Sequence, residues 1–267
     1  RIELPEQMDV LESKVFRNCR ALQEVHLPEG LSRIGESAFY GCTGLKKIRL
    51  PESLLHIGRM AFYRAGLREV HIPASTTSVG GLAFARSLVQ KVWISGGSDM
   101  GKNYGTDVFG GCGKLKTLVL EEGVSHIPNH FAYGCTALVH VVLPQSLKSV
   151  GRHAFEKTAF LAQWKQQACG TDGLAQVDFI LWDGQHLAGE VWIPENVRII
   201  AGGAFYGNTQ ITVVHLPEQV QSIGEAAFKG CKSLRCVYFP SNIKCLGAEV
   251  FSGCTALEEV MLDCGTP

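Results

Sequence analysis

The sequence has no excess of charge of either sign. Its 267 residues include 25 Lys and Arg against 25 Asp and Glu, so the formal net charge at pH 7 is zero. Proteins that bind nucleic acids or anionic membranes need an excess of basic residues, and the balance argues against both partners. The chain also lacks any apolar run that approaches the length of about 18 residues needed to span a bilayer, so no membrane-inserted helix is expected.

Features that mark a complete secreted chain or a familiar enzyme are also missing. No signal peptide is visible, and the chain begins at Arg1 rather than Met, so we expect a processed form or a fragment. Neither end shows the polar cap that terminal repeats need, which favours a longer natural protein. No nucleophile elbow, zincin helix or EF-hand loop appears in the sequence. What remains is a globular composition with 46% hydrophobic and 19% charged residues.

Phenylalanine recurs along this chain with a nearly fixed period. Apart from one double interval, the spacing is 22 to 25 residues, and the members are Phe16, Phe39, Phe62, Phe84, Phe109, Phe131, Phe155, Phe205, Phe228 and Phe251. A period of about 23 residues lies in the range of leucine-rich repeats. The double interval between Phe155 and Phe205 leaves room for a divergent unit, so eleven units are predicted.

Each unit carries an alternating apolar segment that usually ends in Pro, as in residues 45–51, and eight of the ten prolines occupy this position. Alternation with a period of two indicates a short strand, and Pro ends it because it has no N–H to donate. A later Gly, such as Gly35, is expected to permit a tight turn with positive φ. One such coil cannot bury its apolar face alone, so the coils are expected to stack with their strands ~4.8 Å apart.

The repeated unit resembles that of the BspA-type (Treponema-type) leucine-rich repeat proteins. The residues that carry the resemblance in one unit are Leu31, Ile34, Gly35, Ala38, Phe39, Cys42, Leu45, Ile48, Leu50 and Pro51. The pattern recurs about ten times over nearly the whole chain. It implies a leucine-rich-repeat solenoid, mostly β or α/β, of about eleven stacked coils with one parallel sheet along one face. It also implies a secreted or cell-surface protein of bacteria or parasitic protists, and some members are adhesins.

The predicted solenoid, residues 1–267, divides into regular repeats (1–155), a divergent repeat (156–190) and further regular repeats (191–267). In the divergent part, the spacing of Phe160, Leu161 and Trp164 predicts a helix over residues 158–168. Residues 177–182 and 185–188 are predicted to form a hairpin around Asp183 and Gly184, since Asp-Gly suits a two-residue turn. We interpret this part as a structural insertion; the alternative is a binding edge.

Residues 95–104 form a second irregularity. The segment from Gly96 to Asn103 nearly matches a phosphate-binding P-loop after a strand. However, Asn103 stands where the metal-binding Ser or Thr is needed, and no amphipathic helix follows. An enlarged glycine-rich turn is therefore the preferred interpretation.

Six of the ten cysteines follow the Phe position by three residues, namely Cys19, Cys42, Cys112, Cys135, Cys231 and Cys254. Cys135 fits only if Ala132 holds the Phe position and Phe131 has exchanged with it. We expect a buried ladder of free thiols that behave as small apolar groups, because parallel stacking rarely supplies disulfide geometry. The remaining four lie off this ladder, and they are Cys169, Cys236, Cys245 and Cys264. Of these, Cys236 is expected to point outward and to be reactive.

A loose cluster of His126, His130, Cys135 and His140 matches no standard zinc spacing. We therefore predict no metal site and no cofactor.

One residue of each predicted strand must face outward between two buried ones. In chain order this column contains His26, Arg49, His71, Trp93, Val119, Val142, Trp192, His215, Tyr238 and Met261. Binding hot spots favour exposed aromatic and Arg side chains, and solenoids bind partners on their long sheet surface. The predicted binding residues are therefore His26, Arg49, His71, Trp93, Trp192, His215 and Tyr238. The alternative is that these side chains stack only to stabilise the sheet.

A neighbouring outward column contains Glu24, Lys47, Glu69, Lys91, Thr117, His140, Glu190, Val213, Cys236 and Glu259, and its charge alternates through Lys91. Taken together, the residues and the resemblance predict a non-catalytic, extracellular or cell-surface module that binds a protein or glycan through the sheet. A structural spacer within a larger surface protein is the alternative. An enzyme would require a pocket that pairs Cys236, or another nucleophile, with His and a carboxylate.

Overall fold

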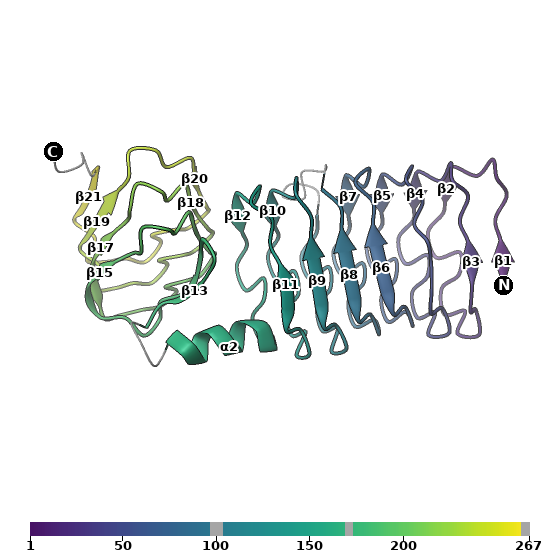
Figure 1. Cartoon of the computed structure of the whole chain (residues 1–267), viewed down its shortest axis with the longest axis horizontal. Helices are drawn as coiled ribbons and strands as arrows, with labels where there is room; N and C mark the ends of the chain where they lie inside the picture. The colour runs from purple at the N-terminus through teal and green to yellow at the C-terminus, as the bar shows by residue number, and fades with distance from the viewer. Residues whose placement is uncertain (97–103, 169–172, 263–267) are drawn as a thin grey trace. The chain divides into compact units, whose positions relative to one another are not determined.

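The computed structural model describes residues 1–96, 104–168 and 173–262. The chain forms two compact units, here called the N-terminal unit (residues 1–147 and 154–160) and the C-terminal unit (residues 148–153 and 161–267). In each unit, coils of the chain stack side by side so that strands of successive coils run parallel (Figure 1). The predicted solenoid with parallel sheets is confirmed. None of the helices in the described ranges is long and apolar enough to cross a membrane.

The N-terminal unit has one line of strands at the predicted alternating segments. Its four-stranded parallel sheet consists of β6 (Glu69–Ile72), β8 (Lys91–Ile94), β9 (Thr117–Leu120) and β11 (His140–Val142). Nearer the N-terminus, β1 (Ile2–Glu3) pairs with β3 (Val25–His26). In β6 the exposed residues Glu69 and His71 alternate with the buried Val70 and Ile72, as a period of two requires. We call this line, with its counterpart in the C-terminal unit, the front sheet.

A second line of short strands, which the sequence analysis did not predict, runs along another wall of the coils. It contains β2 (Val10–Leu11), β4 (Arg33–Ile34), β5 (His56–Ile57) and β7 (Ser78–Val79), paired in that order, and the further short strand β10 (His126–Ile127). The short strand β12 (Ser149–Val150) belongs to the C-terminal unit. The sequence predicted one line of strands along the coils, whereas the structure has two.

The repeated glycine after this second strand has a different role from the one expected. A Cβ on Gly35 would lie 2.5 Å from the backbone nitrogen of Ser13, and Gly58 and Gly80 show equally close approaches to the coil before them. None of the three has a positive φ; the left-handed residues come two positions later, at Ser37 and Met60. Gly is needed here because two backbones touch, and the turn prediction was wrong.

The phenylalanines form a stacked column in the core of the N-terminal unit. From Phe16 to Phe109, consecutive rings lie 5.0 to 5.4 Å apart and nearly parallel. Each backbone N–H in this line donates to the next coil, as Phe39 does to the carbonyl of Ala61. Ala132 makes the equivalent bond, so it holds the Phe position. Phe131 instead meets Phe109 edge-on at 88°, which confirms the predicted exchange.

The cysteine column is mostly buried, as predicted. Four members are fully buried, namely Cys42, Cys112, Cys135 and Cys231. The thiol of each donates to the carbonyl of a Phe one coil earlier, as Cys42 does to Phe16 at 3.0 Å. Cys19 is exposed, contrary to expectation. All eight described cysteines are free, and Cys169 and Cys264 lie outside the described residues.

The C-terminal unit repeats this architecture. Its front sheet contains the parallel strands β15 (Gly189–Trp192), β17 (Ile211–His215), β19 (Cys236–Phe239) and β21 (Glu259–Leu262). Its second sheet contains β13 (Ala175–Val177), β14 (Ile180–Asp183), β16 (Ile199–Ile200), β18 (Ser222–Ile223) and β20 (Cys245–Leu246). Phe205, Phe228 and Phe251 stack in its core.

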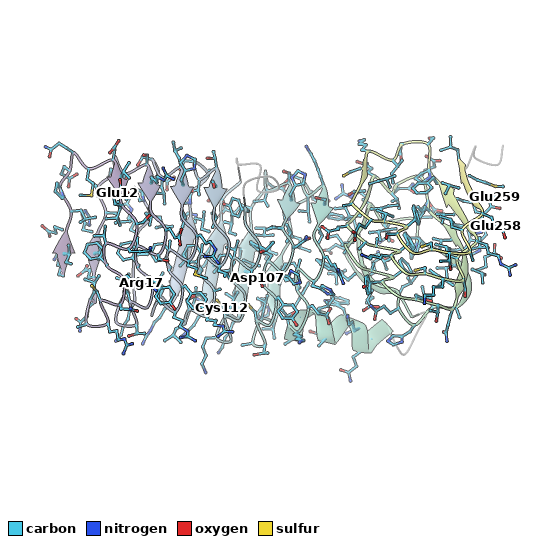
Figure 2. The ribbon with its side chains drawn as sticks, turned by 180° about the vertical axis from the view of Figure 1, so that it is seen from behind. Glu12, Arg17, Asp107, Cys112, Glu258 and Glu259 are labelled. Atoms are coloured by element: carbon cyan, nitrogen blue, oxygen red, sulfur yellow. The ribbon has the colours of Figure 1, made fainter. Side chains whose placement is uncertain are left out.

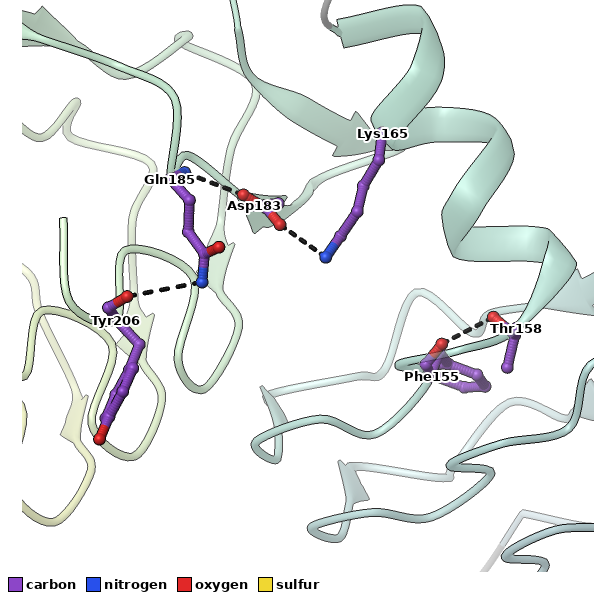
Figure 3. A network of polar contacts seen from close by, with 6 residues as sticks. All are labelled: Phe155, Thr158, Lys165, Asp183, Gln185 and Tyr206. Carbon is purple, nitrogen blue, oxygen red and sulfur yellow. Dashed lines mark hydrogen bonds and ion pairs between the residues drawn. The ribbon is translucent and has the colours of Figure 1, made fainter.

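The divergent repeat contains the predicted helix, α2 (Ala159–Ala168), and an antiparallel pair, β13 and β14. The hairpin turn was misplaced, however. The chain reverses at Asp178, which has a positive φ, and Asp183 ends β14 instead of forming the turn. As Figure 3 shows, the Asp183 carboxylate accepts a bond from the backbone N–H of Gln185 at 2.8 Å and pairs with Lys165 at 2.7 Å. Asp183 therefore shapes the bend after β14 and ties it to α2.

Gly184 takes the Phe position of this divergent coil. Its N–H donates to the carbonyl of Ala204, as the phenylalanines do in regular coils. A Cβ at this position would lie 2.2 Å from the ring of Phe205. Asn208, in the cysteine position of the next coil, closes the bend by donating to the carbonyls of Gly184, Gln185 and Leu187.

Candidate functional site

Three predicted residues form a continuous aromatic column on the front sheet of the C-terminal unit. Trp192, His215 and Tyr238 occupy equivalent positions on β15, β17 and β19, because these parallel strands pair in register. The Trp192 and His215 rings lie 3.6 Å apart with an interplanar angle of 1°, and His215 lies 4.4 Å from Tyr238 at 5°. The register of a parallel sheet brings equal positions to within about 5 Å, which suits ring stacking.

Neighbouring side chains fix the orientation of this column. The Glu190 carboxylate lies 2.7 Å from Nε2 of His215, whose side chain is only 14% exposed between the two flanking rings. In the same flanking column, the neighbouring Cys236 raises the pKa of Tyr238 above its usual value. The carboxylate and the two flanking rings hold the His215 ring between its neighbours.

The column offers an exposed surface at one end. Trp192 is 67% exposed on β15, an edge strand of its sheet, and Met261 continues the line on β21 at 39%. Because the rings stack face to face, their edges point outward along the column. The surface is a firm amphipathic ridge, flanked by the exposed carboxylates of Glu190 and Glu259.

In the N-terminal unit, the structure brings two predicted residues together. His71 and Trp93 are in register on β6 and β8, followed by Val119 and Val142. The His71 ring is hydrogen-bonded to the Ser95 hydroxyl at 2.8 Å. In the flanking column, the charges of Glu69 and Lys91 lie 4.0 Å apart.

His26 and Arg49 do not join this column. Residues 46–50 form no strand, so the prediction that Arg49 lies on the sheet was wrong, and its guanidinium pairs with Glu29 at 3.3 Å. The sheet opens here into a hollow of about 610 Å³ whose lining includes Glu24, His26, Lys46, Lys47, Arg49, Arg68 and Glu69. Four basic side chains on adjacent coils disfavour a closed ladder, because like charges on facing strands repel. The clustering of these basic residues in the sequence was the signal that could have predicted this break in the sheet.

The other candidate sites are not assembled. Among the described residues, no group of three or more His, Cys, Asp or Glu side chains could hold a metal ion. In the loose cluster for which no metal site was predicted, Cys135 donates its thiol to the Phe109 carbonyl at 3.1 Å, and His140 is exposed on β11. The P-loop-like residues 97–103 lie outside the described residues.

Comparison with known proteins agrees with this architecture. The sequence matches the BspA type leucine rich repeat region in six copies, over residues 1–104, 98–167 and 186–266. The chain belongs to the BspA-type leucine-rich repeat family. Residues 168–185, which the matches leave out, hold the β13–β14 hairpin of the divergent repeat.

One solved structure supports the same fold, and a second is similar in sequence. A leucine-rich repeat protein from Bacteroides ovatus is 24% identical with a TM-score of 0.56, over 96% of this chain and 64% of that one. This BspA-type chain thus spans less than two thirds of that relative. A leucine rich cell surface protein from Faecalibacterium prausnitzii is 19% identical with a TM-score of 0.40, over 99% of this chain and 88% of that one. No curated protein matches the sequence.

Proposed function

We propose that this BspA-type repeat array is a non-catalytic binding module that holds a partner against the front sheet of the C-terminal unit. The observation that carries the proposal is the column of Trp192, His215 and Tyr238, stacked within 3.6 and 4.4 Å and open to solvent at Trp192. Rigid, exposed aromatic side chains lose little entropy on binding and dominate the energy of protein interfaces.

A protein is the partner that this surface fits best. Apart from the outer face of Trp192, the stacked rings present their edges and form a ridge, whereas a sugar ring needs an open aromatic face. Glu190 and Glu259, at the two ends of the flanking column, supply part of the polar rim that surrounds an apolar centre in protein interfaces. Placement outside the cell or on its surface is part of the proposal and is supported by the resemblance to BspA-type adhesins.

The contacts of Cys236 support a non-catalytic role. An enzyme would need this nucleophile beside a histidine base. Among the described residues, the Cys236 thiol interacts with the phenol of Tyr238 and not with a His side chain.

The test is a binding screen of the purified chain against extracellular-matrix proteins, cell-surface proteins and a glycan array. The variant Trp192→Ala/Tyr238→Ala is compared with Tyr206→Ala, which removes an exposed Tyr away from the front sheet. We expect a protein hit whose affinity falls at least tenfold in the double variant only, with circular dichroism unchanged. Equal affinity for both variants, or hits on glycans alone, would contradict the proposal.

A spacer function is favoured by one observation. His215 is already satisfied by two rings and a carboxylate within the chain, so the column also acts as a clamp across three strands. If no partner binds and the double variant loses only stability, the spacer is the better account.

A further inference from the structure

A second aromatic column runs along the N-terminal unit, one residue after the Phe position of each coil. Arg17 lies over the Tyr40 ring at 4.9 Å, and Tyr40 stacks on Tyr63 at 5.2 Å and 12°. Three coils later, Tyr133 resumes the column and is covered by the Lys157 ammonium at 5.0 Å.

The two coils between these tyrosines carry Ala85 and Gly110 at the same position, and both are buried. Their small size leaves a slot of about 440 Å³, bordered by Tyr63 and Tyr133 and floored by the two small residues and Gly111. Three coil spacings of ~4.8 Å place the two rings roughly 14 Å apart. The slot lies within the range of about 300–1,000 Å³ typical of small-molecule sites.

One acidic and one basic side chain complete the lining of the slot. Asp107 is half-buried and Arg86 is exposed, and neither is engaged in an ion pair within the described part of the chain. Figure 2 shows Asp107 among the middle coils of this unit. Their charges cancel, so the slot favours no ionic ligand. Together they offer a strong acceptor and a forked donor for neighbouring hydroxyl groups.

We infer that this slot binds a neutral saccharide. A pyranose combines an apolar C–H face, which packs on an aromatic ring, with a rim of hydroxyls that both accept and donate hydrogen bonds. The tyrosines supply the rings, and Asp107 and Arg86 supply the polar partners. The glycines leave room for these two polar side chains, since a Cβ on Gly110 would lie 3.1 Å from Oδ1 of Asp107 and one on Gly111 would lie 3.4 Å from Cγ of Arg86. The length of the slot admits more than one sugar ring. An anionic glycan would instead favour the basic hollow around Lys46 and Arg68.

The slot is separate from the aromatic column of the C-terminal unit, so this inference does not rest on the proposed function. Binding is measured by titration calorimetry with cellobiose, maltose, lactose and N,N′-diacetylchitobiose. A sulfated heparin disaccharide represents the anionic alternative, and N-acetyl-tryptophanamide represents a protein side chain. We expect at least one neutral disaccharide to bind with a submillimolar Kd and to bind more tightly than both alternatives. Failure of all four, or preference for either alternative, would overturn the inference.

The decisive variant is Ala85→Tyr, which continues the column of Tyr40 and Tyr63 into the slot. It should keep the fold and weaken disaccharide binding at least tenfold. Tyr133→Ala, which removes one wall without filling the slot, should weaken binding similarly and decides the matter if Ala85→Tyr does not fold. Tyr40→Ala, one coil outside the slot, and Trp192→Ala/Tyr238→Ala should bind within twofold of the parent chain. Undiminished binding by Tyr133→Ala, or by a folded Ala85→Tyr, would place the sugar elsewhere.

Discussion

The indole of Trp192 and the imidazole of His215 lie in parallel planes, with ring centroids 3.6 Å apart. Tyr238 covers the opposite face of His215 at 4.4 Å, and Glu190 holds the edge of the ring. The same contacts that present an aromatic ridge to solvent therefore also join three strands of the front sheet.

Removal of the central ring should weaken the C-terminal unit. Aromatic pairs contribute about 0.5–1.5 kcal/mol each beyond area burial, so His215→Ala is expected to lower the free energy of unfolding by roughly 1–3 kcal/mol. Urea denaturation followed by circular dichroism measures this. His56→Ala, an exposed His on β5, is the control and should change stability by less than about 0.5 kcal/mol. Equal losses of unfolding free energy in the two variants would show that the ring stack does not contribute to stability.

Gly184 should not tolerate a side chain. A Cβ there would lie 2.2 Å from Cε1 of Phe205, a ring fixed in the core, so Gly184→Ala should cost about 1–3 kcal/mol of unfolding free energy through forced repacking. At Gly30 the nearest atom to a new Cβ is 3.9 Å away, so Gly30→Ala serves as the control. Thermal and urea unfolding of both variants give the comparison. A stable Gly184→Ala would mean that the bend after β14 is looser than described.

Asn208 should be among the most sensitive polar positions. Its amide donates to three carbonyls of the divergent coil, its Oδ1 accepts from the N–H groups of Gln210 and Ile211, and the residue is 4% exposed. Asn208→Ala leaves these buried groups without partners, and we expect a loss of roughly 2–4 kcal/mol in urea denaturation. Exposed Asn196, which makes one long bond to Asp178, is the matched control. A loss no larger than that of Asn196→Ala would contradict this closing role.

The buried thiols should make stability depend on alkaline pH. Burial, and next the neighbouring Cys254, raise the pKa of Cys231 from 9.0 to about 12; burial likewise raises that of Cys42 to about 11. The folded state thus holds its thiol protons more tightly than the unfolded state. The protonated thiols therefore contribute to the free energy of unfolding. This contribution is fully present below pH 9 and is lost as the pH rises towards 11 or 12.

Urea denaturation between pH 7 and 10.5 tests this linkage. The free energy of unfolding should fall over the upper part of the range. Cys231→Ala should be less stable at pH 7, because it loses the bond to the Phe205 carbonyl, but its stability should fall less steeply with pH. If the free energy of unfolding falls equally with pH in the parent chain and in Cys231→Ala, the Cys231 thiol does not cause the pH dependence.

Repetition made most of this fold predictable. The Phe period, the alternating segments and the exchange of Phe131 with Ala132 all follow from one pattern applied many times. The second sheet was missed because two-residue strands such as Arg33–Ile34 are too short to show alternation. The hairpin turn was misplaced because Asp183-Gly184 has turn chemistry, whereas tertiary contacts with Lys165 and Phe205 place it after the strand.

The candidate site was predictable in part for the same reason. Register follows from the repeat, so Trp192, His215 and Tyr238 could be aligned before their stacking was known. Arg49 was misplaced, because a break in a sheet depends on neighbouring coils, here on basic residues clustered across adjacent coils, and not on the pattern of one unit. The slot between Tyr63 and Tyr133 exists because Ala85 and Gly110 have no large side chain. Its presence becomes apparent only when the coils are stacked.

The most direct test of the central claim is hydroxyl-radical footprinting of the chain with and without its captured protein partner. The account predicts that oxidation of Trp192 and Tyr238 falls sharply in the complex, while that of Trp164 on α2 stays unchanged. Unchanged oxidation of Trp192 and Tyr238 in a saturated complex would contradict binding through the front sheet.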